Sequence, residues 1–457
     1  MAKAIIFTDM AGYYGFGRAA GAYRIASEFR KRGQSIKVID CFCSFSLEQI
    51  KTIILNHKTH DMEWIGFSTT FMVNLESNSM LDDKKTKNKN FAVEKNADSY
   101  TGLLFEEERE LFSWIKSIGL RVILGGYRTR TEGYYIDPDV EILTGPAEDK
   151  FFKDFNFTDS QIYYDEDDFI QEEEDLPIEV ARGCIFKCKF CFFPLLGKKL
   201  WDFVKSPEVL REEMMRNYIN HGTTGYMISD DTYNDSVEKI ETLNQMYKTL
   251  PFDLTFSTYA RLDLMIAHPH TMDILYESGM RSVFFGIETF NQNAGKFVGK
   301  GMDPDKVKKG LLDFRKKYPD VLIYASMIAG LPTETIEELN ESHRFLTQEA
   351  KVSNVMFHKL AIVEGTDLHL NSGQYGYKMR GGEWTREDGL TSEQMRDWCV
   401  QKRTEYENHP GGYVFYNRVR NLGYTDDELL KLKFSTHKKE ILDKTNEKRE
   451  LYINNIL

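Results

Sequence analysis

The chain has 457 residues, too many for one ordinary domain, and 41% of them are hydrophobic, enough for two or three buried cores. Its formal net charge is −12, and Lys and Arg are spread along the sequence. This argues against a nucleic acid partner, because gripping a phosphate backbone requires a concentrated basic surface. No run of eighteen apolar residues occurs, and the N-terminal stretch lacks the features of a secretory signal. We therefore expect a cytoplasmic protein without a membrane span.

The first 160 residues alternate between strand-like and helix-like patterns. One helix pattern ends at Gly33, and the next begins at Ser46, a residue type that caps helix N-termini. The strand-like runs are 4–9, 35–40, 64–70, 121–126 and 140–145, and the helix-like runs are 21–33, 46–58 and 107–119. Strands separated by helices predict a doubly wound parallel sheet, so we expect one α/β domain over residues 1–160.

Two polar stretches interrupt this pattern. Residues 77–102 are rich in Lys and Asn and show no periodicity, which predicts a mobile insertion in the first domain. Residues 161–175 contain a run of carboxylates, which we interpret as a solvated linker rather than as a metal site. The second stretch is therefore expected to separate two domains.

The alternation resumes at Leu176 and continues to about Thr366. Six strand-like runs, separated by amphipathic helix patterns, lie at 176–183, 225–231, 254–260, 282–289, 322–330 and 355–365. Six β/α units predict a partial (β/α)6 barrel over residues 176–366, related to the eightfold TIM-type barrel. A mostly helical segment with a loop at 372–383 is expected to complete residues 367–457.

Three of the six cysteines, Cys184, Cys188 and Cys191, fall within eight residues, directly after the first strand of the expected barrel. Barrel active sites form in such loops, and thiolates are the usual ligands of iron–sulfur clusters. Three thiolates can hold three irons of a cubane cluster and leave the fourth iron open. A structural zinc site is the alternative, but it normally needs four protein ligands, and no downstream Cys or His pair has a suitable spacing.

The spacing Cys-x-x-x-Cys-x-x-Cys, with the aromatic Phe190 before the third cysteine, resembles the radical SAM superfamily. The resemblance implies a [4Fe–4S] cluster whose open iron binds S-adenosylmethionine (SAM) through its amino and carboxylate groups. It also implies reductive cleavage of SAM to a 5′-deoxyadenosyl radical, with flavodoxin or ferredoxin as the electron donor.

Segments at the ends of the later strands agree with this resemblance. Asp230 stands where the family often has a Gly-Gly-Glu segment, although two adjacent carboxylates could equally cap the next helix. Ile328 and Leu331 lie in a segment like the one that packs on adenine, with core packing as the alternative. The SAM contacts that the resemblance implies are Phe190, Asp230, Ser257, Tyr259, Arg261, Gly286, Glu288, Ile328, Gly330 and Leu331.

Residues 1–160 resemble the cobalamin-binding domain that precedes many radical SAM domains. The resemblance implies that Ser68, Thr69, Gly125 and Gly126 line the pocket for the nucleotide tail of cobalamin, because small residues leave room for it. Tight packing between sheet and helices is the alternative. The histidine of the Asp-x-His-x-x-Gly motif is absent, and the aromatic residues at positions 13, 14 and 16 could fill the space of the corrin ring.

Three reactions compete. In the first, cobalamin carries a methyl group to an unactivated carbon; in the second, the N-terminal domain is vestigial and the radical drives a rearrangement, cyclisation or oxidation. The third, methylthiolation, needs three more upstream cysteines, but only Cys41 and Cys43 lie there, and both are expected to be buried apolar side chains. A non-catalytic iron–sulfur redox or sensing protein is the alternative outside enzymes.

The substrate is not identified by any motif, and neither is a catalytic acid or base. The net acidity favours a small molecule or a peptide over a nucleic acid. Candidates for facing it are His358, Glu364, Tyr375 and Tyr377, although Tyr and His more often have packed structural roles.

Overall fold

The computed structural model describes residues 3–10, 14–70, 72, 94–95, 102–103, 106–126, 140–192, 197–380, 382–405 and 416–457. The chain forms two compact units. Unit 1 combines Met1–Pro177, Glu212–Thr223 and Lys439–Leu457, and unit 2 combines Ile178–Arg211 and Thr224–Lys438. Each unit therefore contains segments that are far apart in the sequence. Within the described residues, no helix is both long and apolar enough to cross a membrane.

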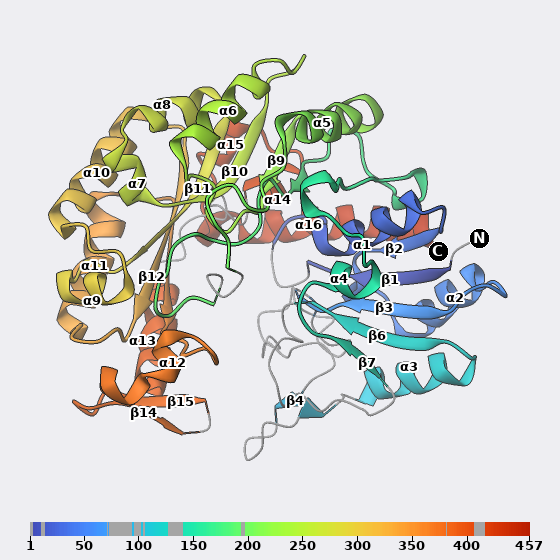
Figure 1. Ribbon diagram of the computed structural model, residues 1–457, viewed down its shortest axis with the longest axis horizontal. Coiled ribbons are helices and arrows are strands. Elements are labelled where there is room, and N and C mark those ends of the chain that lie inside the picture. The colour runs from blue at the N-terminus through green and yellow to red at the C-terminus, as the bar shows by residue number, and fades with distance from the viewer. Residues whose placement is uncertain are drawn as a thin grey trace. The chain divides into compact units, whose positions relative to one another are not determined.

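Unit 1 contains a five-stranded parallel sheet in the order β2-β1-β3-β6-β7 (Figure 1). Numbered along the chain, this is the 2-1-3-4-5 order of doubly wound folds, and the α/β class expected for this part is confirmed. The strands are Ala4–Thr8 (β1), Ile36–Ile39 (β2), Trp64–Ser68 (β3), Arg121–Gly125 (β6) and Glu141–Leu143 (β7). All residues of β1 and β2 are buried, as expected for strands that are covered on both faces.

The helices of unit 1 begin and end close to the expected positions. They include Ala20–Lys31 (α1), Leu47–His57 (α2), Glu106–Ser117 (α3) and Ala147–Phe151 (α4), with short 3-10 turns at Phe42–Ser44, Phe157–Asp159 and Glu166–Asp168. Ser46 caps α2 as predicted, because its side chain accepts from Gln49 N while the Gln49 side chain accepts from Ser46 N. Of the expected insertion, Glu94–Lys95 (β4) pairs with Gly102–Leu103 (β5). Most of residues 77–102 lies outside the described residues.

The last helix, Phe434–Ile456 (α16), contributes its residues from Lys439 onward to unit 1. Hydrogen bonds join Gly15 N to Thr445 Oγ1 (3.1 Å), Asp40 N to Tyr452 OH (2.9 Å) and Arg449 Nη2 to Asp9 Oδ1 (3.2 Å). Asp9 and Asp40 directly follow β1 and β2, and Gly15 lies in the loop between β1 and α1. The helix therefore completes the carboxyl end of two strands that precede it by about 400 residues.

Arg18 is the centre of a buried charge cluster in unit 1. Its guanidinium donates to Glu174 Oε1 at 2.6 Å and to Asp40 Oδ2 at 3.0 Å, and the exposed fraction of each of the three side chains is 3% or less. The rings of Phe16 and Tyr452 each lie 5.0 Å from the guanidinium carbon. Two carboxylates and two aromatic faces together offset the cost of burying this cation.

The acidic stretch 161–175 is not the solvated linker that we expected. Asp168 is buried and accepts hydrogen bonds of 2.6 and 2.8 Å from Arg30, and Glu174 belongs to the Arg18 cluster. The whole stretch is part of unit 1. Asp168 and Glu174 are buried because they neutralise arginines of α1 and of the loop before α1, partners that a local sequence pattern does not reveal, whereas Glu166, Asp167, Glu172 and Glu173 are exposed.

Unit 2 is built on a six-stranded sheet in the order β13-β12-β11-β10-β9-β8, in which β9 to β13 pair in parallel. The strands are Leu176–Ile178 (β8), Gly225–Ile228 (β9), Thr255–Ala260 (β10), Met280–Glu288 (β11), Leu322–Ala329 (β12) and Asn354–Lys359 (β13). Neighbours in the sheet follow one another along the chain. The expected partial barrel of six β/α units is therefore confirmed.

Helices line one face of this sheet, as Figure 1 shows for α6 to α11. The connecting helices are Pro207–His221 (α5), Val237–Tyr247 (α6), Leu262–Ala267 (α7), His270–Glu277 (α8), Gln292–Val298 (α9), Pro304–Lys317 (α10) and Ile336–Arg344 (α11), followed by a π-helical turn at Phe345–Glu349. The residues of α5 from Glu212 onward belong to unit 1. Phe285 of β11 packs on Phe314 of α10, with ring centroids 5.3 Å apart. Side chains alternate along a strand, so Phe284 belongs to the opposite face, where it contacts Tyr259 and Tyr324 at 4.7 Å each.

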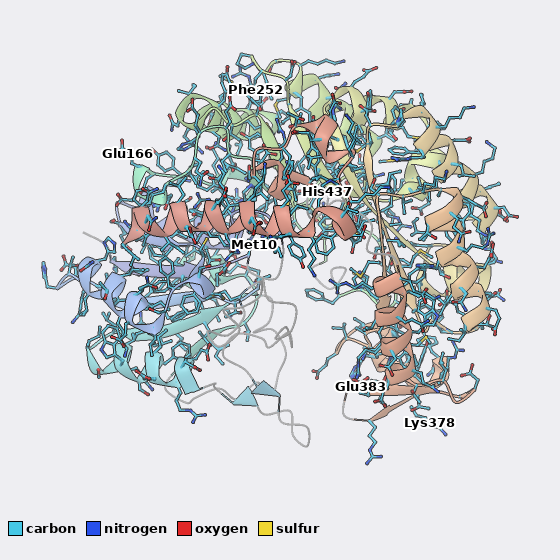
Figure 2. The ribbon with its side chains drawn as sticks, turned by 180° about the vertical axis from the view of Figure 1, so that it is seen from behind. Met10, Glu166, Phe252, Lys378, Glu383 and His437 are labelled. Atoms are coloured by element: carbon cyan, nitrogen blue, oxygen red, sulfur yellow. The ribbon has the colours of Figure 1, made fainter. Side chains whose placement is uncertain are left out.

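The segment after β13 is mostly helical, as expected, but it also contains a β-hairpin. Residues 372–383, expected to be a loop, contain a 3-10 turn and most of a β-hairpin, whose strands carry the labelled Lys378 and Glu383 in Figure 2. The elements are Asp367–Leu370 (α12), Ser372–Tyr375 (η8), Tyr377–Arg380 (β14), Glu383–Arg386 (β15), Ser392–Glu405 (α13), Tyr416–Arg420 (α14) and Asp426–Leu429 (α15). The hairpin was not predicted because its outward positions are polar and glycines lie beside its strands, so the sequence looks like a loop.

Candidate active site

The cysteine loop begins where β8 ends. Residues 180–182 pair with residues 203–205 through backbone hydrogen bonds of 2.9 and 3.0 Å, so the loop between them is closed at its base. The loop carries the half-buried Cys184, Cys188 and Cys191, and Cys191 N donates to Cys188 O at 3.0 Å. Phe190 is also half-buried. The three thiols are therefore presented by one tethered loop at the carboxyl edge of the sheet.

Asp230, at the end of β9, fixes the backbone just before the cysteines. Its Oδ1 accepts from Val180 N at 2.9 Å and from Ala181 N at 2.8 Å, and the residue is 1% exposed. Burial raises the pKa of Asp230 to about 6. The structure thus gives Asp230 a role that we did not foresee. It does not cap the next helix, since the N-cap of α6 is Ser236.

Two cysteine sulfurs have polar neighbours from the next strand ends. Thr232 Oγ1 lies 3.3 Å from Cys184 Sγ, and Arg261 Nη1 donates to Cys188 Sγ at 3.8 Å. Burial raises the pKa of the Cys188 thiol, while the positive charges of Lys300 and Arg261 act in the opposite direction. The net effect is a raised pKa, so the two cations offset only part of the cost of burying the thiolate, which is the form that binds metal.

Glu288 forms a second polar centre at the end of β11. Its Oε1 accepts from Lys300 Nζ at 2.9 Å, and the same ammonium donates to Gly286 O. The backbone of Glu288 is left-handed, with φ of 71°, at a register shift between Gly286 and Glu288. Such conformations in a non-glycine residue are uncommon and concentrate at functional sites.

Gly330 lies directly after β12, in a segment that the C-terminal hairpin covers. A Cβ added at Gly330 would lie 2.7 Å from Trp384 Cη2, and Tyr377 OH donates to Gly330 O at 2.7 Å. Leu331 is fully buried and Ile328 is 7% exposed. Core packing therefore accounts for Leu331, and Tyr377 is a packing residue rather than one that faces a substrate.

Two further expected site residues lie within β10. Ser257 lies inside the strand, is fully buried and donates to Asn417 Oδ1. Tyr259, next to the last residue of the strand, packs its ring against Phe284. The strand was expected over residues 254–260 and runs over Thr255–Ala260, so its predicted end is correct. Of this group only Arg261 lies beyond the strand end, beside the cysteine loop.

In unit 1, the expected tail-binding residues come together at the ends of β3 and β6. Thr69 donates to Gly125 O through its amide (2.8 Å) and its hydroxyl (3.0 Å). A Cβ at Gly126 would lie 2.8 Å from Thr70 Oγ1, whereas the nearest described atom to a Cβ at Gly125 would be Leu143 Cβ, at 4.0 Å. Among the described residues, space therefore remains beside Gly125 but not beside Gly126. Cys41 and Cys43 are buried, as predicted.

Several polar residues of the site were not identified from the sequence. They are Thr232, Asn234, Asp263 and Lys300, which contact the cysteines or the residues beside them. Asp263 could have been found from its position two residues after Arg261 in an Arg-Leu-Asp sequence. No group of three or more His, Cys, Asp or Glu among the described residues is placed around one metal ion.

Glu334 gives the site a pH-dependent element. It is 2% exposed, accepts from Thr289 Oγ1 at 2.6 Å, and burial raises its pKa to about 8. Because the folded state binds this proton more tightly, the free energy of unfolding should fall as the pH rises from about 4.5 to about 8. Glu334→Gln, which cannot ionise, should remove that decline and add a few kcal/mol above pH 8, at about 1.4 kcal/mol per pKa unit.

Urea unfolding of the wild type and of Glu334→Gln at pH 5, 7 and 9 measures how the free energy of unfolding of each depends on pH. The exposed Glu337, three residues away, provides the matched control, and Glu337→Gln should follow the wild type at every pH. Parallel pH profiles for the wild type and Glu334→Gln would show that the carboxyl is not held neutral.

Thr333, between Gly330 and α11, has a left-handed backbone with φ of 66°. A β-branched residue is strained in this conformation and glycine is not, so Thr333→Gly should raise the free energy of unfolding by about 1 kcal/mol. Thr335→Gly is the control, because Thr335 has φ of −100° and caps α11. That change should lower stability by a few tenths of a kcal/mol. Thermal unfolding should order the variants accordingly, and a destabilised Thr333→Gly would contradict the strain.

Comparison with known sequences identifies the family of unit 2. Residues 178–346 match the Radical SAM superfamily. An uncharacterized methyltransferase of Pyrococcus horikoshii is 26% identical over 168 residues, which cover 37% of this chain and 36% of that protein. The ribosomal protein uS12 methylthiotransferase RimO of Legionella pneumophila is 27% identical over 202 residues, covering 41% of this chain and 46% of that protein. The chain thus spans less than half the length of these curated relatives.

Solved structures show the same fold over most of the chain. The cobalamin-dependent SAM radical enzyme OxsB, with aqua-cobalamin and SAM bound, superimposes with a TM-score of 0.53 at 14% identity, covering 99% of this chain and 72% of that one. The radical SAM methyltransferase TsrM from Kitasatospora setae, with cobalamin and a [4Fe–4S] cluster, gives a TM-score of 0.54 at 13% identity, covering 84% and 80%. At these identities the likeness shows the fold. The match to a radical SAM domain covers residues 178–346.

Proposed function

We propose that this chain is a radical SAM enzyme that holds a [4Fe–4S] cluster through Cys184, Cys188 and Cys191. The observation that carries the proposal is the tethered loop with three thiols at the carboxyl edge of the unit 2 sheet. Polar side chains from the ends of β9, β10 and β11 surround this loop. A bound cluster supplies the electron with which SAM is split into methionine and a 5′-deoxyadenosyl radical.

Different residues of the chain would hold the cluster and bind SAM. The three thiolates bind three irons, which leaves the fourth iron for SAM. Asp230 anchors the backbone at the start of the loop, and Arg261 and Lys300 supply positive charge beside Cys188. Glu288, on its left-handed backbone at the strand end, is the candidate for contact with a polar group of SAM. Ile328, at the end of β12, remains the candidate for the adenine contact.

Anaerobic reduction of the reconstituted protein in the presence of SAM tests the proposal. Chromatography with mass detection should find 5′-deoxyadenosine and methionine in amounts that depend on the reductant. An iron content of about four per chain with no turnover of SAM would favour the redox or sensing alternative. A protein that assembles no cluster would contradict the proposal as a whole.

We further propose that the reaction is transfer of a methyl group to an unactivated carbon, with cobalamin held by unit 1. Bound cobalamin would supply the methyl carrier. The doubly wound sheet and the space that the described residues leave beside Gly125 support this proposal, as does the likeness of fold to OxsB and TsrM. The nucleotide tail would lie beside Ser68, Thr69 and Gly125. Gly126 fits this role less well, because Thr70 occupies the space next to its Cα.

One observation favours a reaction without cobalamin. Phe16, in the loop after β1, is 3% exposed, and it packs against Tyr452 and Arg18 within unit 1. An aromatic side chain therefore occupies the loop in which the family motif has its cobalt-binding histidine. In this second candidate, unit 1 is structural and the radical acts on the substrate directly.

Gly125→Val separates the two candidates. Because a Cβ at Gly125 would lie no closer than 4.0 Å to any described atom, the variant should fold normally while filling the space proposed for the nucleotide tail. The wild type is incubated with hydroxocobalamin and desalted, and its visible spectrum should show a retained corrin. The variant should lose most of it, with the cluster spectrum unchanged. A wild type that retains no corrin would favour the reaction without cobalamin.

A further inference from the structure

Arg261 is held more firmly than a substrate-binding side chain requires. Its Nε and Nη2 donate to the two oxygens of Asp263 at 3.1 and 2.6 Å, and its guanidinium carbon lies 4.0 Å from the centroid of the Phe186 ring. Asn234 fixes the backbone, since its side chain accepts from Arg261 N (2.8 Å) and donates to Arg261 O (2.9 Å). The orientation of the guanidinium is thus determined on three sides.

The remaining nitrogen of the Arg261 guanidinium, Nη1, points at a cysteine sulfur. Nη1 donates to Cys188 Sγ at 3.8 Å, and Arg261 is only 7% exposed. Lys300 is the other cation near Cys188, but its ammonium donates to Glu288 and Gly286 O rather than to sulfur. Arg261 is therefore a cation that combines charge with a hydrogen bond to a proposed cluster ligand.

We infer that Arg261 is a positioning residue that sets the reduction potential of the cluster through its N–H bond to Cys188. The inference rests on the proposed function, because it presumes a cluster on the three cysteines. Reduction adds negative charge to a cluster and its sulfurs, and hydrogen bonds to those sulfurs and nearby charge tune the potential. A buried cation that donates to sulfur stabilises the reduced form, so Arg261 should make the potential less negative.

This role differs from the one that family resemblance implies, which is contact with a polar group of SAM. Nε and Nη2 are taken by Asp263, and Nη1 faces Cys188. If Arg261 only binds SAM, its substitution should change the reduction potential of the cluster only when SAM is present. If Arg261 tunes the cluster, the potential should change even without SAM, so the decisive measurement is made without SAM.

The test compares the full-length wild type with Arg261→Met and Arg261→Lys, each reconstituted anaerobically and titrated without SAM. Electron paramagnetic resonance reports the fraction of reduced cluster. At the wild-type midpoint, the ratio of reduced to oxidised cluster should fall about tenfold in Arg261→Met, a shift of about 59 mV to more negative potential for one electron. Arg261→Lys should shift less, because it keeps the charge but loses the planar fork.

Arg281→Met is the matched control. Arg281 is a half-buried arginine that, like Arg261, has its cation near a ring, 5.1 Å from Tyr276, but it lies at the beginning of β11 while the site lies at the strand ends. Its potential should equal that of the wild type. If Arg261→Met loses its iron, Arg261→Gln is titrated in its place with the same expectation.

The outcomes distinguish this inference from the function on which it rests. A wild type without a cluster overturns the proposed function. A full cluster with an unchanged potential in the Arg261 variants overturns the tuning role alone. An unchanged potential together with weaker SAM binding in the Arg261 variants would mean that Arg261 binds SAM instead. A negative shift in the Arg261 variants, with none in Arg281→Met, supports the inference.

Discussion

Cys188→Ala is expected to abolish cluster assembly and, with it, reductive cleavage of SAM. Cys188 is the central thiol of the loop, and the chain offers no replacement within the loop. Loss of 5′-deoxyadenosine formation should exceed about 100-fold, because mutations merely adjacent to a metal ligand already cost 10–100-fold. Iron and sulfide analysis, with the visible absorption of the reconstituted protein, measures the cluster, and mass detection measures the product.

Cys399→Ala is the control for this variant. Cys399 is a partly exposed thiol of α13, and burial raises its pKa to about 12, so it is a poor metal ligand at neutral pH. Its removal should leave iron content and turnover unchanged. If Cys188→Ala kept four irons per chain, the assignment of the three cysteines as cluster ligands would be wrong.

Arg18→Met is expected to destabilise unit 1 severely, because it breaks the buried charge cluster. The methionine side chain fills a similar volume but leaves Asp40 and Glu174 buried without their shared cation. Removing one partner from a buried ion pair costs about 3–5 kcal/mol, which is a large part of the stability of an ordinary domain. Native-state hydrogen exchange of the amides in β1 and β2 measures the effect on unit 1 separately from unit 2.

The comparison for this variant is Arg32→Met in the same unit. Arg32 pairs with Glu28 and with Asp154, and its side chain is 29% exposed, so water replaces much of what the pairs provide. Its loss should cost about 1 kcal/mol or less. Equal effects of the two substitutions would mean that the Arg18 cluster contributes no more than a surface ion pair.

Much of the fold could be predicted because the relevant signals are local. Apolar runs of strand length, separated by amphipathic helices, leave few arrangements for a parallel sheet, and Ser46 marks a helix start by its own chemistry. The position of the cysteines in the site also followed from chain order, since the loop after a barrel strand lies at its carboxyl end.

The remaining features depend on contacts between distant residues. The acidic stretch was predicted to be solvated because charged residues are usually exposed, and nothing near Glu174 indicates Arg18, which is 156 positions away. Asp230 was assigned to SAM or to a helix cap, whereas its oxygen binds the backbone of another strand end. Such roles depend on which amides the fold leaves unpaired nearby, and a motif does not record that.

The contribution of α16 to unit 1 has a consequence for biosynthesis. Residues 1–177 leave the ribosome long before Thr445, Arg449 and Tyr452 are translated, so the ends of β1 and β2 must wait for their partners. At ordinary translation rates this delay is on the order of tens of seconds. The nascent unit is thus exposed to chaperones and proteases throughout synthesis of the radical SAM domain, and its maturation is coupled to completion of that domain.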